Sequence, residues 1–398
     1  MKLKYAYIPL AMMALILISI AGYLLKPVPI QLKPSSFQQL PGWNGAHVKQ
    51  SFAAFQRSCN TFMHQAPEQT VGSDQIQLQV KDWLPACRAS KTLYPITNAS
   101  TKDFFEKWFQ PIEFRQKTTL KGLFTGYYLP QLQGSLTKTA EYSVPIYGLP
   151  DNLISVNLRQ FGNDFSRHQL IGRLENNKLT PFYTRADINK GAIDKHSPVL
   201  AWVNSPIDRL FLGIQGSGMV KLTNGDTLYL GYAGENGAPY TAIAKVLIDK
   251  GVMTLSNASM QGIKKYLEAH PDEMDDVLNQ NKSFVFFQLL KNSAAMGAQG
   301  VVLTPGYSLA VDRKWIPLGA PLWLATTHPT NKSNSHEAVL QRLMIAQDTG
   351  GAIRGAVRGD VFWGAGKKAT FIAGNMKNKG NYWLLLPREA VNTLFTQK

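Results

Sequence analysis

The chain has 398 residues, and its 42 Lys plus Arg against 26 Asp plus Glu give a net charge of +16. A chain of this length with 44% hydrophobic residues can bury a substantial core, which argues against general disorder. The charged fraction of 17% makes coiled coils and acidic tails unlikely candidates, and two cysteines exclude disulfide-dense miniature folds and four-cysteine metal sites.

An uncharged apolar run extends from Tyr5 to Leu25, with lysines on both sides. Its length suits a helix that crosses about 30 Å of hydrocarbon. The basic residues before it favour a cytoplasmic N-terminus, with everything after Lys26 exported. We expect an uncleaved membrane anchor, with the rest of the chain exported. A cleaved signal peptide with a weak site at Ser19 and Ala21, which leaves a free exported form, is the alternative.

Export affects the interpretation of Cys59 and Cys87. In an oxidising compartment they can form a disulfide, but two unpaired buried cysteines are equally compatible with the sequence. The positive charge favours an anionic partner, which could be nucleic acid, a membrane surface or an acidic polymer. Export and the absence of a dense Lys/Arg run argue against nucleic acid. Basic charge spread over the surface for solubility is the alternative.

The first part of the exported chain reads as a spacer followed by helices. Four prolines in residues 26–41 indicate an extended spacer. Residues 45–114 read as mainly helical. The sequence predicts one helix that begins at 101–103 and is ended by Pro111.

From residue 123 to about 240 the pattern changes to short β-rich runs, such as 142–149, 199–203 and 227–232. Asn224 and Gly225 separate the runs 219–222 and 227–230 and predict a hairpin. Ser259 is expected to cap a helix that reaches His270, and a second helix is expected over 272–278. After residue 300 the runs 301–304, 321–325, 340–346 and 382–386 predict strands again.

Three aspartates in the last third of the chain are candidate catalytic residues. Asp312, Asp348 and Asp360 each lie at or just beyond a β-like run, beside glycines or a turn. Carboxyls at strand ends can meet in a groove, where apolar surroundings raise the pKa of a carboxyl enough for proton donation. Phe362 and Trp363 are candidates for an apolar wall beside Asp360. The alternative is that these aspartates only cap turns. The seven histidines show no paired metal spacing, so no catalytic metal is expected.

Six stretches together resemble the family of membrane-bound lytic murein transglycosylase A. They are FTGYYLP (124–130), FLGIQGSGMVKLTNGD (211–226), GYAGENGAPY (231–240), NKSFVFF (281–287), LTPGYSLAVDRKWIPLGAPLWL (303–324) and AQDTGGAIRGAVRGDVFWGAG (346–366). The last two resemble a module named for three aspartates. The chain departs from well-known members in having no cysteine for lipid attachment after its apolar run.

The resemblance implies a mainly β protein with a helical N-terminal part, in which a double-psi β-barrel domain and an inserted β-barrel domain enclose a groove. The expected division is 1–34 for anchor and spacer, 35–123 for the first part of the double-psi barrel, 124–286 for the inserted domain and 287–398 for the second part of the barrel.

The resemblance also implies a reaction on peptidoglycan glycan strands, without a cofactor. The β-1,4 bond between N-acetylmuramic acid and N-acetylglucosamine is cleaved by the muramic acid's own C6 hydroxyl, which leaves a 1,6-anhydro end. One carboxylic acid then suffices as acid and base. Asp360 matches that residue, and Asp348 and Asp312 are expected to support it. The expected substrate contacts are Tyr127, Tyr128, Gln215, Ser217, Thr349, Gly350 and Trp363.

Two other functions remain open from the sequence. A hydrolytic glycosidase would use Asp360 with Asp348 as a pair and release reducing sugars. A peptidoglycan-binding protein without activity would keep the fold but perform no turnover.

Overall fold

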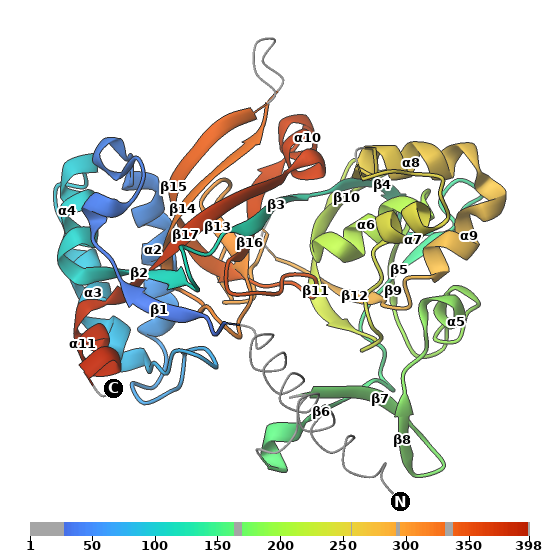
Figure 1. The fold of residues 1–398 in the computed structure, drawn as a ribbon. Coiled ribbons are helices and arrows are strands. Elements are labelled where there is room, and N and C mark those ends of the chain that lie inside the picture. Colours follow the sequence, from blue (N-terminus) through green and yellow to red (C-terminus); the bar gives the residue numbers. More distant parts are fainter. Residues whose placement is uncertain (1–27, 163–168, 256, 292–294, 331–336, 397–398) are drawn as a thin grey trace, which may run out of the picture.

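The computed structural model describes residues 28–396, apart from 163–168, 256, 292–294 and 331–336 (Figure 1). Two bodies lie side by side: one is built from the beginning and end of the sequence, and the other from its middle. The predicted anchor from Tyr5 to Leu25 lies outside the described residues. Within the described part, none of the helices is both long and apolar enough to span a bilayer.

A closed barrel forms the centre of the first body. Its sheet contains β1 (Gln31–Pro34), β2 (Phe109–Arg115), β3 (Gly122–Leu129), β13 (Ser308–Val311), β14 (Pro321–Pro329), β15 (Glu337–Asp348), β16 (Arg358–Ala365) and β17 (Lys377–Pro387). The strand order is β1-β2-β17-β14-β15-β13-β16-β3, and β3 also pairs with β17. The strands from β17 to β3 therefore close on themselves, which leaves β1 and β2 outside the ring.

Helices cover one side of this barrel (Figure 1). They are α2 (Lys49–Phe62), α3 (Val80–Thr92), α4 (Asn98–Trp108) and α11 (Arg388–Thr396). Their apolar faces share one core with the strands, where Phe52 packs edge-to-face on Phe104 and Phe55 packs edge-to-face on Phe109. Because β17 is covered by helices on one side and faces the barrel interior on the other, 382–387 is buried without alternation.

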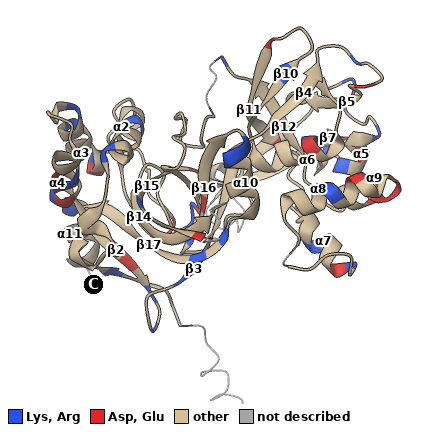
Figure 2. Ribbon diagram, turned by 90° about the horizontal axis from the view of Figure 1, so that it is seen from above, with Lys and Arg blue, Asp and Glu red and all other residues tan. Residues whose placement is uncertain are grey.

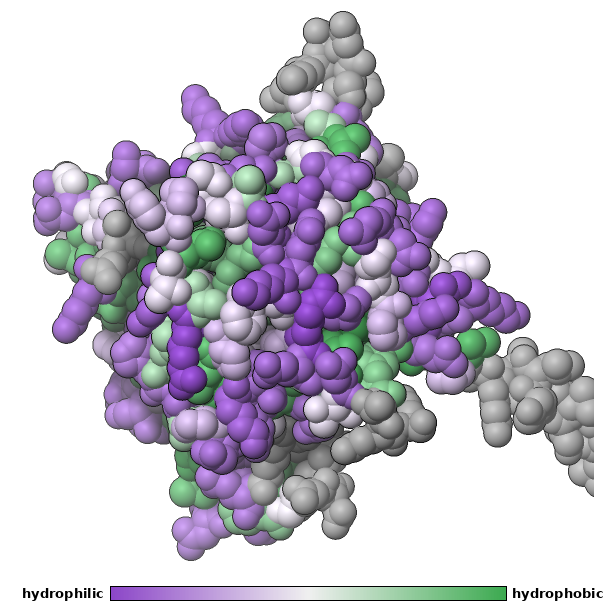
Figure 3. Space-filling view, turned by 90° about the vertical axis from the view of Figure 1, so that its left-hand side faces the viewer, coloured by the Kyte–Doolittle hydropathy of each residue, from purple (hydrophilic) through white to green (hydrophobic). Residues whose placement is uncertain are grey.

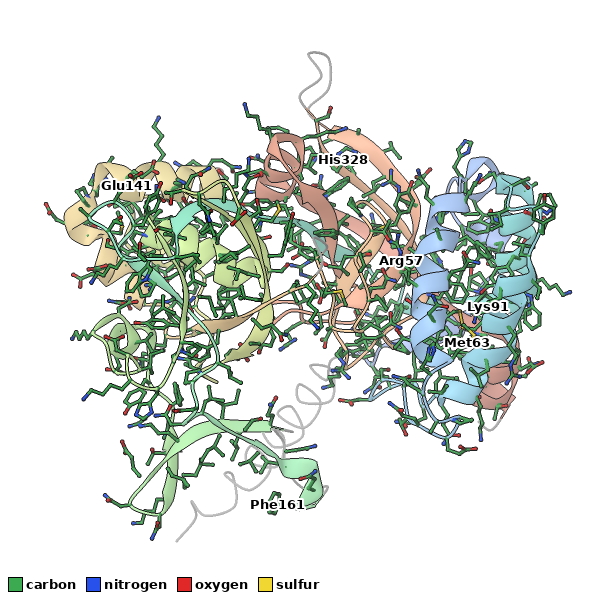
Figure 4. All side chains as sticks on the ribbon, turned by 180° about the vertical axis from the view of Figure 1, so that it is seen from behind. Arg57, Met63, Lys91, Glu141, Phe161 and His328 are labelled. Carbon is green, nitrogen blue, oxygen red and sulfur yellow. A yellow bond between two sulfur atoms is a disulfide. The ribbon has the colours of Figure 1, made fainter. Side chains whose placement is uncertain are left out.

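Cys59 of α2 and Cys87 of α3 form a disulfide within this helical layer. Of the two alternatives that the sequence left open, the bonded pair is the one present. Figure 4 shows both helices beside the barrel, with Arg57, Met63 and Lys91 labelled. The disulfide therefore joins two helices of this layer and does not link the layer to the barrel strands.

The second body contains a curved sheet in the order β12-β11-β10-β4-β9-β5. Its strands are β4 (Gln131–Ser135), β5 (Val144–Tyr147), β9 (Val199–Val203), β10 (Gly218–Leu222), β11 (Thr227–Glu235) and β12 (Val285–Leu289). The edge strands β5 and β12 approach each other, so this barrel is nearly closed. Its helices are α5 (Arg185–Asn189), α6 (Pro206–Gln215), α7 (Ile243–Asp249), α8 (Met260–Ala269) and α9 (Pro271–Asn279).

A small three-stranded sheet, which we call the arm, extends from the second body at the lower edge of Figure 1. It consists of β6 (Ile154–Asn157), β7 (Gln169–Glu175) and β8 (Lys178–Pro181). Asn176 and Asn177, both with positive φ, make the tight turn between β7 and β8. Phe161, which is 69% exposed, lies in the connection between β6 and β7 at one end of the arm (Figure 4).

Several predictions from the sequence are confirmed. The chain is mainly β with helices near its N-terminus, and it contains a closed and a nearly closed barrel. The hairpin at Asn224 and Gly225 joins β10 to β11, and Gly225 has the positive φ that the turn requires. Ser259 caps α8 by accepting a hydrogen bond from the Gly262 amide, and α9 follows where the second helix is expected.

Three local predictions are wrong. Helix α4 begins at Asn98, three residues before the predicted start at 101–103, with Thr97 as its cap, and Pro111 lies inside strand β2. The proposed spacer over 26–41 contains β1, which pairs with β2, and the buried side chains of Phe37 and Leu40. Residues 301–304 form only an isolated bridge. For the spacer, the long-range pairing of β1 with β2 overrides the local pattern, whereas the start of α4 is set by the local capping box of Thr97 and Ser100.

The surface of the helical side is largely hydrophilic, with apolar residues scattered among polar ones (Figure 3). Lys and Arg are distributed over both bodies, and acidic residues occur on α9 and on β16 (Figure 2). The positive charge is therefore spread over the described surface and not gathered on one element.

Candidate active site

Strand β13 brings the three predicted aspartates together. Ala310 in β13 is the register partner of Asp348, at the end of the parallel strand β15, and of Asp360, in the antiparallel strand β16. Asp312 directly follows β13. Since paired strands lie about 5 Å apart, the register places the three carboxyl groups around one short strand.

Asp360 is a half-buried carboxyl with one direct hydrogen-bond donor. The Thr125 hydroxyl on β3 donates to Asp360 Oδ1 at 2.7 Å, and the same hydroxyl oxygen accepts from Nη2 of Arg358 at 2.9 Å. Burial raises the pKa of Asp360 to about 6, while the Thr125 hydrogen bond and the Arg358 charge oppose the rise and the charge of Asp348 adds to it. A carboxyl of this pKa keeps a far larger protonated fraction near neutral pH than an ordinary aspartate, and it can both donate and accept a proton.

Asp348 accepts three hydrogen bonds. The Tyr127 hydroxyl donates to Oδ2 at 2.8 Å, and the amides of Ala298 and Thr349 donate to Oδ1 at 3.0 and 2.9 Å. Burial raises the pKa of Asp348 against the lowering effect of these bonds. Burial, Asp348 and Asp360 together raise the pKa of Tyr127 well above its ordinary value. Tyr127 therefore stays protonated and holds Asp348 in place.

Asp312 is buried and serves as a brace between two loops. Its Oδ1 accepts from the Lys314 amide at 3.1 Å, and its Oδ2 accepts from the Gly355 amide at 2.7 Å. Gly355 has φ of 119°, a conformation that side chains other than glycine rarely adopt. Both carboxylate oxygens thus connect the turn after β13 to the loop that leads into β16.

Thr349 and Gly350 begin that loop. The Thr349 hydroxyl donates to the Val311 carbonyl at 2.9 Å, and Arg354 donates to the Gly350 carbonyl at 3.2 Å. Thr349 also lines a cavity of about 1270 Å³. These contacts fix the loop directly after Asp348.

Tyr128, Gln215 and Ser217 lie where β3 enters the second body. The Gln215 side chain accepts from the Tyr128 amide at 2.9 Å, so the end of α6 is attached to the strand that carries Thr125. Ser217 is buried just after the left-handed Gly216 that ends α6. Burial raises the pKa of Tyr128 to about 12, and its ring lines a separate cavity of about 780 Å³ between the two bodies.

Trp363 does not lie beside Asp360. A Cβ added to Gly126 would come within 2.7 Å of the Trp363 ring, while Thr125, the neighbour of Gly126, faces Asp360. Because side chains alternate along a strand, Trp363 is on the opposite face of β16 from Asp360, and its ring contacts His328 at 5.1 Å between centroids. Of the predicted apolar wall only Phe362 is present, packed against Tyr127 at 5.2 Å.

Sequence reasoning missed Thr125 and Arg358 as partners of Asp360. Both carried a usable signal: Thr125 lies two residues before Tyr127, and Arg358 two residues before Asp360, so each shares a strand face with a predicted site residue. Over the residues that the structure describes, no group of three or more His, Cys, Asp or Glu is arranged to hold a metal ion.

Comparisons with known proteins agree with the resemblance of the sequence. The family model of the MltA specific insert domain matches residues 123–288, and that of the 3D domain matches residues 307–386. Membrane-bound lytic murein transglycosylase A of Escherichia coli (strain K12) is 34% identical over 276 residues, which cover 69% of this chain and 68% of that protein.

Solved structures of the same name superpose on the fold. MltA from Neisseria gonorrhoeae matches with a TM-score of 0.75 at 35% identity, covering 91% of this chain and 94% of that one. Escherichia coli MltA with bound chitohexaose matches with a TM-score of 0.64 at 28% identity, covering 86% and 91%. The chain therefore belongs to the membrane-bound lytic murein transglycosylase A family, a family of peptidoglycan-degrading lyases.

Proposed function

We propose that this enzyme cleaves the β-1,4 bond between N-acetylmuramic acid and N-acetylglucosamine by internal transfer, with Asp360 as its single acid and base. Asp360 gives its proton to the glycosidic oxygen as the bond from that oxygen to C1 breaks. The C6 hydroxyl of the same muramic acid then attacks C1 and passes its proton to the Asp360 carboxylate. The products are a free 4-hydroxyl and a 1,6-anhydro end, and Asp360 regains its proton.

The observation that carries this proposal is the state of the Asp360 carboxyl. Its pKa of about 6 suits a group that donates and then recovers a proton near neutral pH. The Thr125 hydroxyl supports the charged form by its hydrogen bond, and Arg358 supports that hydroxyl. The two states of the carboxyl are therefore close enough in free energy for both to take part in one cycle.

Asp348 is better suited to positioning than to catalysis as a second carboxylate. The three donors on its oxygens leave it committed to Tyr127 and to the amides of Ala298 and Thr349. A base that activates water needs an oxygen directed at that water. We assign Asp348 and Asp312 to holding the loops around Asp360, and Tyr127 to holding Asp348.

We propose that the glycan strand lies between the two bodies. Escherichia coli MltA has been solved with chitohexaose, a β-1,4-linked chain of N-acetylglucosamine, which has the linkage of the murein backbone. Thr349, Gly350, Tyr128, Gln215 and Ser217 are the proposed contacts with the strand, whereas Trp363 is withdrawn because of its orientation.

The proposed division has a barrel domain made of 35–123 and 287–398, with 124–286 inserted as a second domain. We further propose that the run from Tyr5 to Leu25 anchors the enzyme to the inner membrane, so that both domains act in the periplasm. The family name, which describes relatives as membrane-bound, supports an envelope location.

The test is mass spectrometry of murein sacculi digested by the full chain, beside an Asp360→Asn variant. We expect fragments that end in 1,6-anhydro-muramic acid from the wild type and none from the variant. Reducing ends, which are heavier by one water, would instead indicate hydrolysis. Binding to sacculi without release of fragments would indicate a binding protein. Either result contradicts the proposal.

A further inference from the structure

A polar cavity of about 1270 Å³ opens beside the candidate active site. Ala298 and Thr349, whose amides both donate to Asp348, are part of its lining. The lining also includes the C-terminal end of α2, the segment 69–74 and the arm, which contributes Asn157 and Gln169. The cavity exceeds the roughly 300–1,000 Å³ of an ordinary small-molecule site and has room for a longer ligand.

Three cationic side chains line this cavity: Arg313, Lys314 and Arg354. All three are exposed. Asp312 brings them together, because one of its oxygens holds the turn of Arg313 and Lys314 and the other holds the loop of Arg354 through the Gly355 amide. The lining also contains two carboxylates, Asp74 and Asp312, so three cations against two anions leave it with a net positive charge. Asp312 is 6% exposed and is directed at the two amides, whereas the cations are open to solvent.

The rest of the lining is rich in side-chain amides, which both donate and accept hydrogen bonds and so match a peptide backbone. They belong to Gln65, Gln69, Gln77, Gln299, Asn157 and Gln169. Among the described atoms, Oε1 of Gln65 and Nε2 of Gln299 are buried without a hydrogen-bond partner. Because these two atoms are closed off from solvent, the amides that a ligand can reach are the exposed ones of Gln69, Gln77, Asn157 and Gln169.

The cavity lacks the surface that a sugar ring would use. The one aromatic residue of its described lining is Phe62, which is 2% exposed and stacks on Trp83. Flat aromatic faces open to a ligand are therefore missing from this lining, although they are the usual partners of sugar rings. The glycan backbone of murein is also neutral where the muramic acid bears its peptide, and the carboxylates belong to the stem peptides.

We infer that this cavity binds the stem peptide of a muramic acid next to the scissile bond, with Arg313 and Lys314 paired to peptide carboxylates. The inference rests on the proposed function, since it requires a murein strand at Asp360. It makes Arg313 and Lys314 specificity-determining residues: they distinguish peptide-bearing murein from bare glycan and take no part in the proton transfers.

The test compares two substrates with the full chain in detergent: murein carrying its stem peptides, and the same glycan strands stripped of peptides by an amidase. The double variant Arg313→Ala/Lys314→Ala is measured beside Lys117→Ala/Lys121→Ala, which removes the same charge from the exposed loop between β2 and β3. Two partly solvated ion pairs predict a roughly 3- to 10-fold rise in KM on peptide-bearing murein, with kcat unchanged. The KM on stripped strands should not change, and the control pair should match the wild type.

A charge-retaining variant and a binding measurement complete the test. Arg313→Lys/Lys314→Arg should restore the wild-type KM. Calorimetry with a soluble disaccharide tetrapeptide should show the same 3- to 10-fold weakening for the alanine pair, whether or not turnover occurs. Equal KM values for wild type and alanine pair, an equal change on both substrates, or an equal change in the control pair would overturn the inference. A wild type that binds the fragment through these residues but makes no anhydro ends would overturn only the proposed function.

Discussion

Replacement of Asp360 by Asn should remove activity and, at the same time, stabilise the protein above neutral pH. In the folded protein burial raises the pKa of Asp360 from its ordinary 3.8 to about 6. Each pKa unit corresponds to about 1.4 kcal/mol, so ionisation of Asp360 costs the folded state up to roughly 3 kcal/mol. Asn cannot ionise, while its carbonyl can still accept the Thr125 hydrogen bond. The variant therefore lacks the free-energy penalty of an ionised carboxyl in the folded state.

Because the pKa of Asp360 is raised in the folded protein, the stability difference between wild type and variant depends on pH in a definite direction. Below about pH 4 the carboxyl is protonated in both folded and unfolded chains, and the substitution should change stability little. Between about pH 4 and 6 the unfolded chain ionises first, so the wild type loses stability relative to the variant. Above about pH 7 the full difference should be present.

Urea unfolding of the full chain at pH 4 and pH 8, followed by tryptophan fluorescence, measures this difference. All the tryptophans except Trp202 lie in sequence outside 124–286, so the signal mainly reports on the barrel that carries Asp360. Asp103→Asn, on the exposed surface of α4, is the control and should change stability by less than about 0.5 kcal/mol. A variant that is no more stable than the wild type at pH 8 would refute the reasoning, because it would mean that burial does not penalise the carboxylate.

Three further predictions concern other contacts. Thr125→Val removes the hydrogen bond that favours ionised Asp360, so the pH at which kcat/KM falls should move upward by about one unit; an unchanged or lower value would contradict this. Cys59→Ser/Cys87→Ser, measured by urea unfolding under oxidising conditions, should lose roughly 3 kcal/mol, because the bond closes a long loop in the unfolded chain; equal midpoints for variant and wild type would count against it. Gly126→Ala should destabilise the barrel by about 1–3 kcal/mol, because the added methyl meets an indole ring and a helix backbone at 2.7–3.0 Å; a thermal midpoint at the wild-type value would show that β3 has more room than the structure gives it.

Two parts of the site have different proposed tasks: the exposed cations of the cavity beside Asp348 bind the peptide, and the half-buried carboxyl of Asp360 transfers protons. Asp312 joins the two, since it braces both the turn of Arg313 and Lys314 and the loop that leads into β16. A change at Asp312 should therefore affect substrate binding and turnover together, whereas a change at Arg313 should affect binding alone.

The sequence by itself determined the features that depend on neighbours along the chain. The hairpin at Asn224 and Gly225 and the cap at Ser259 follow from side chains within a few residues of the backbone they stabilise. The ordered motifs identified the family and directed attention to Asp360. The tertiary structure is needed to see that Asp348 and Asp360 flank Ala310.

Only the tertiary structure decided the surroundings of Asp360. Thr125, its hydrogen-bond donor, is 235 residues away in sequence and reaches it because β3 pairs with β16 when the barrel closes. The same closure turns Trp363 to the opposite face, and packing of α2 on α3 brings Cys59 to Cys87. Strand pairing across such separations depends on the packing of the whole core, and local propensities and patterns carry no information about which distant strands meet.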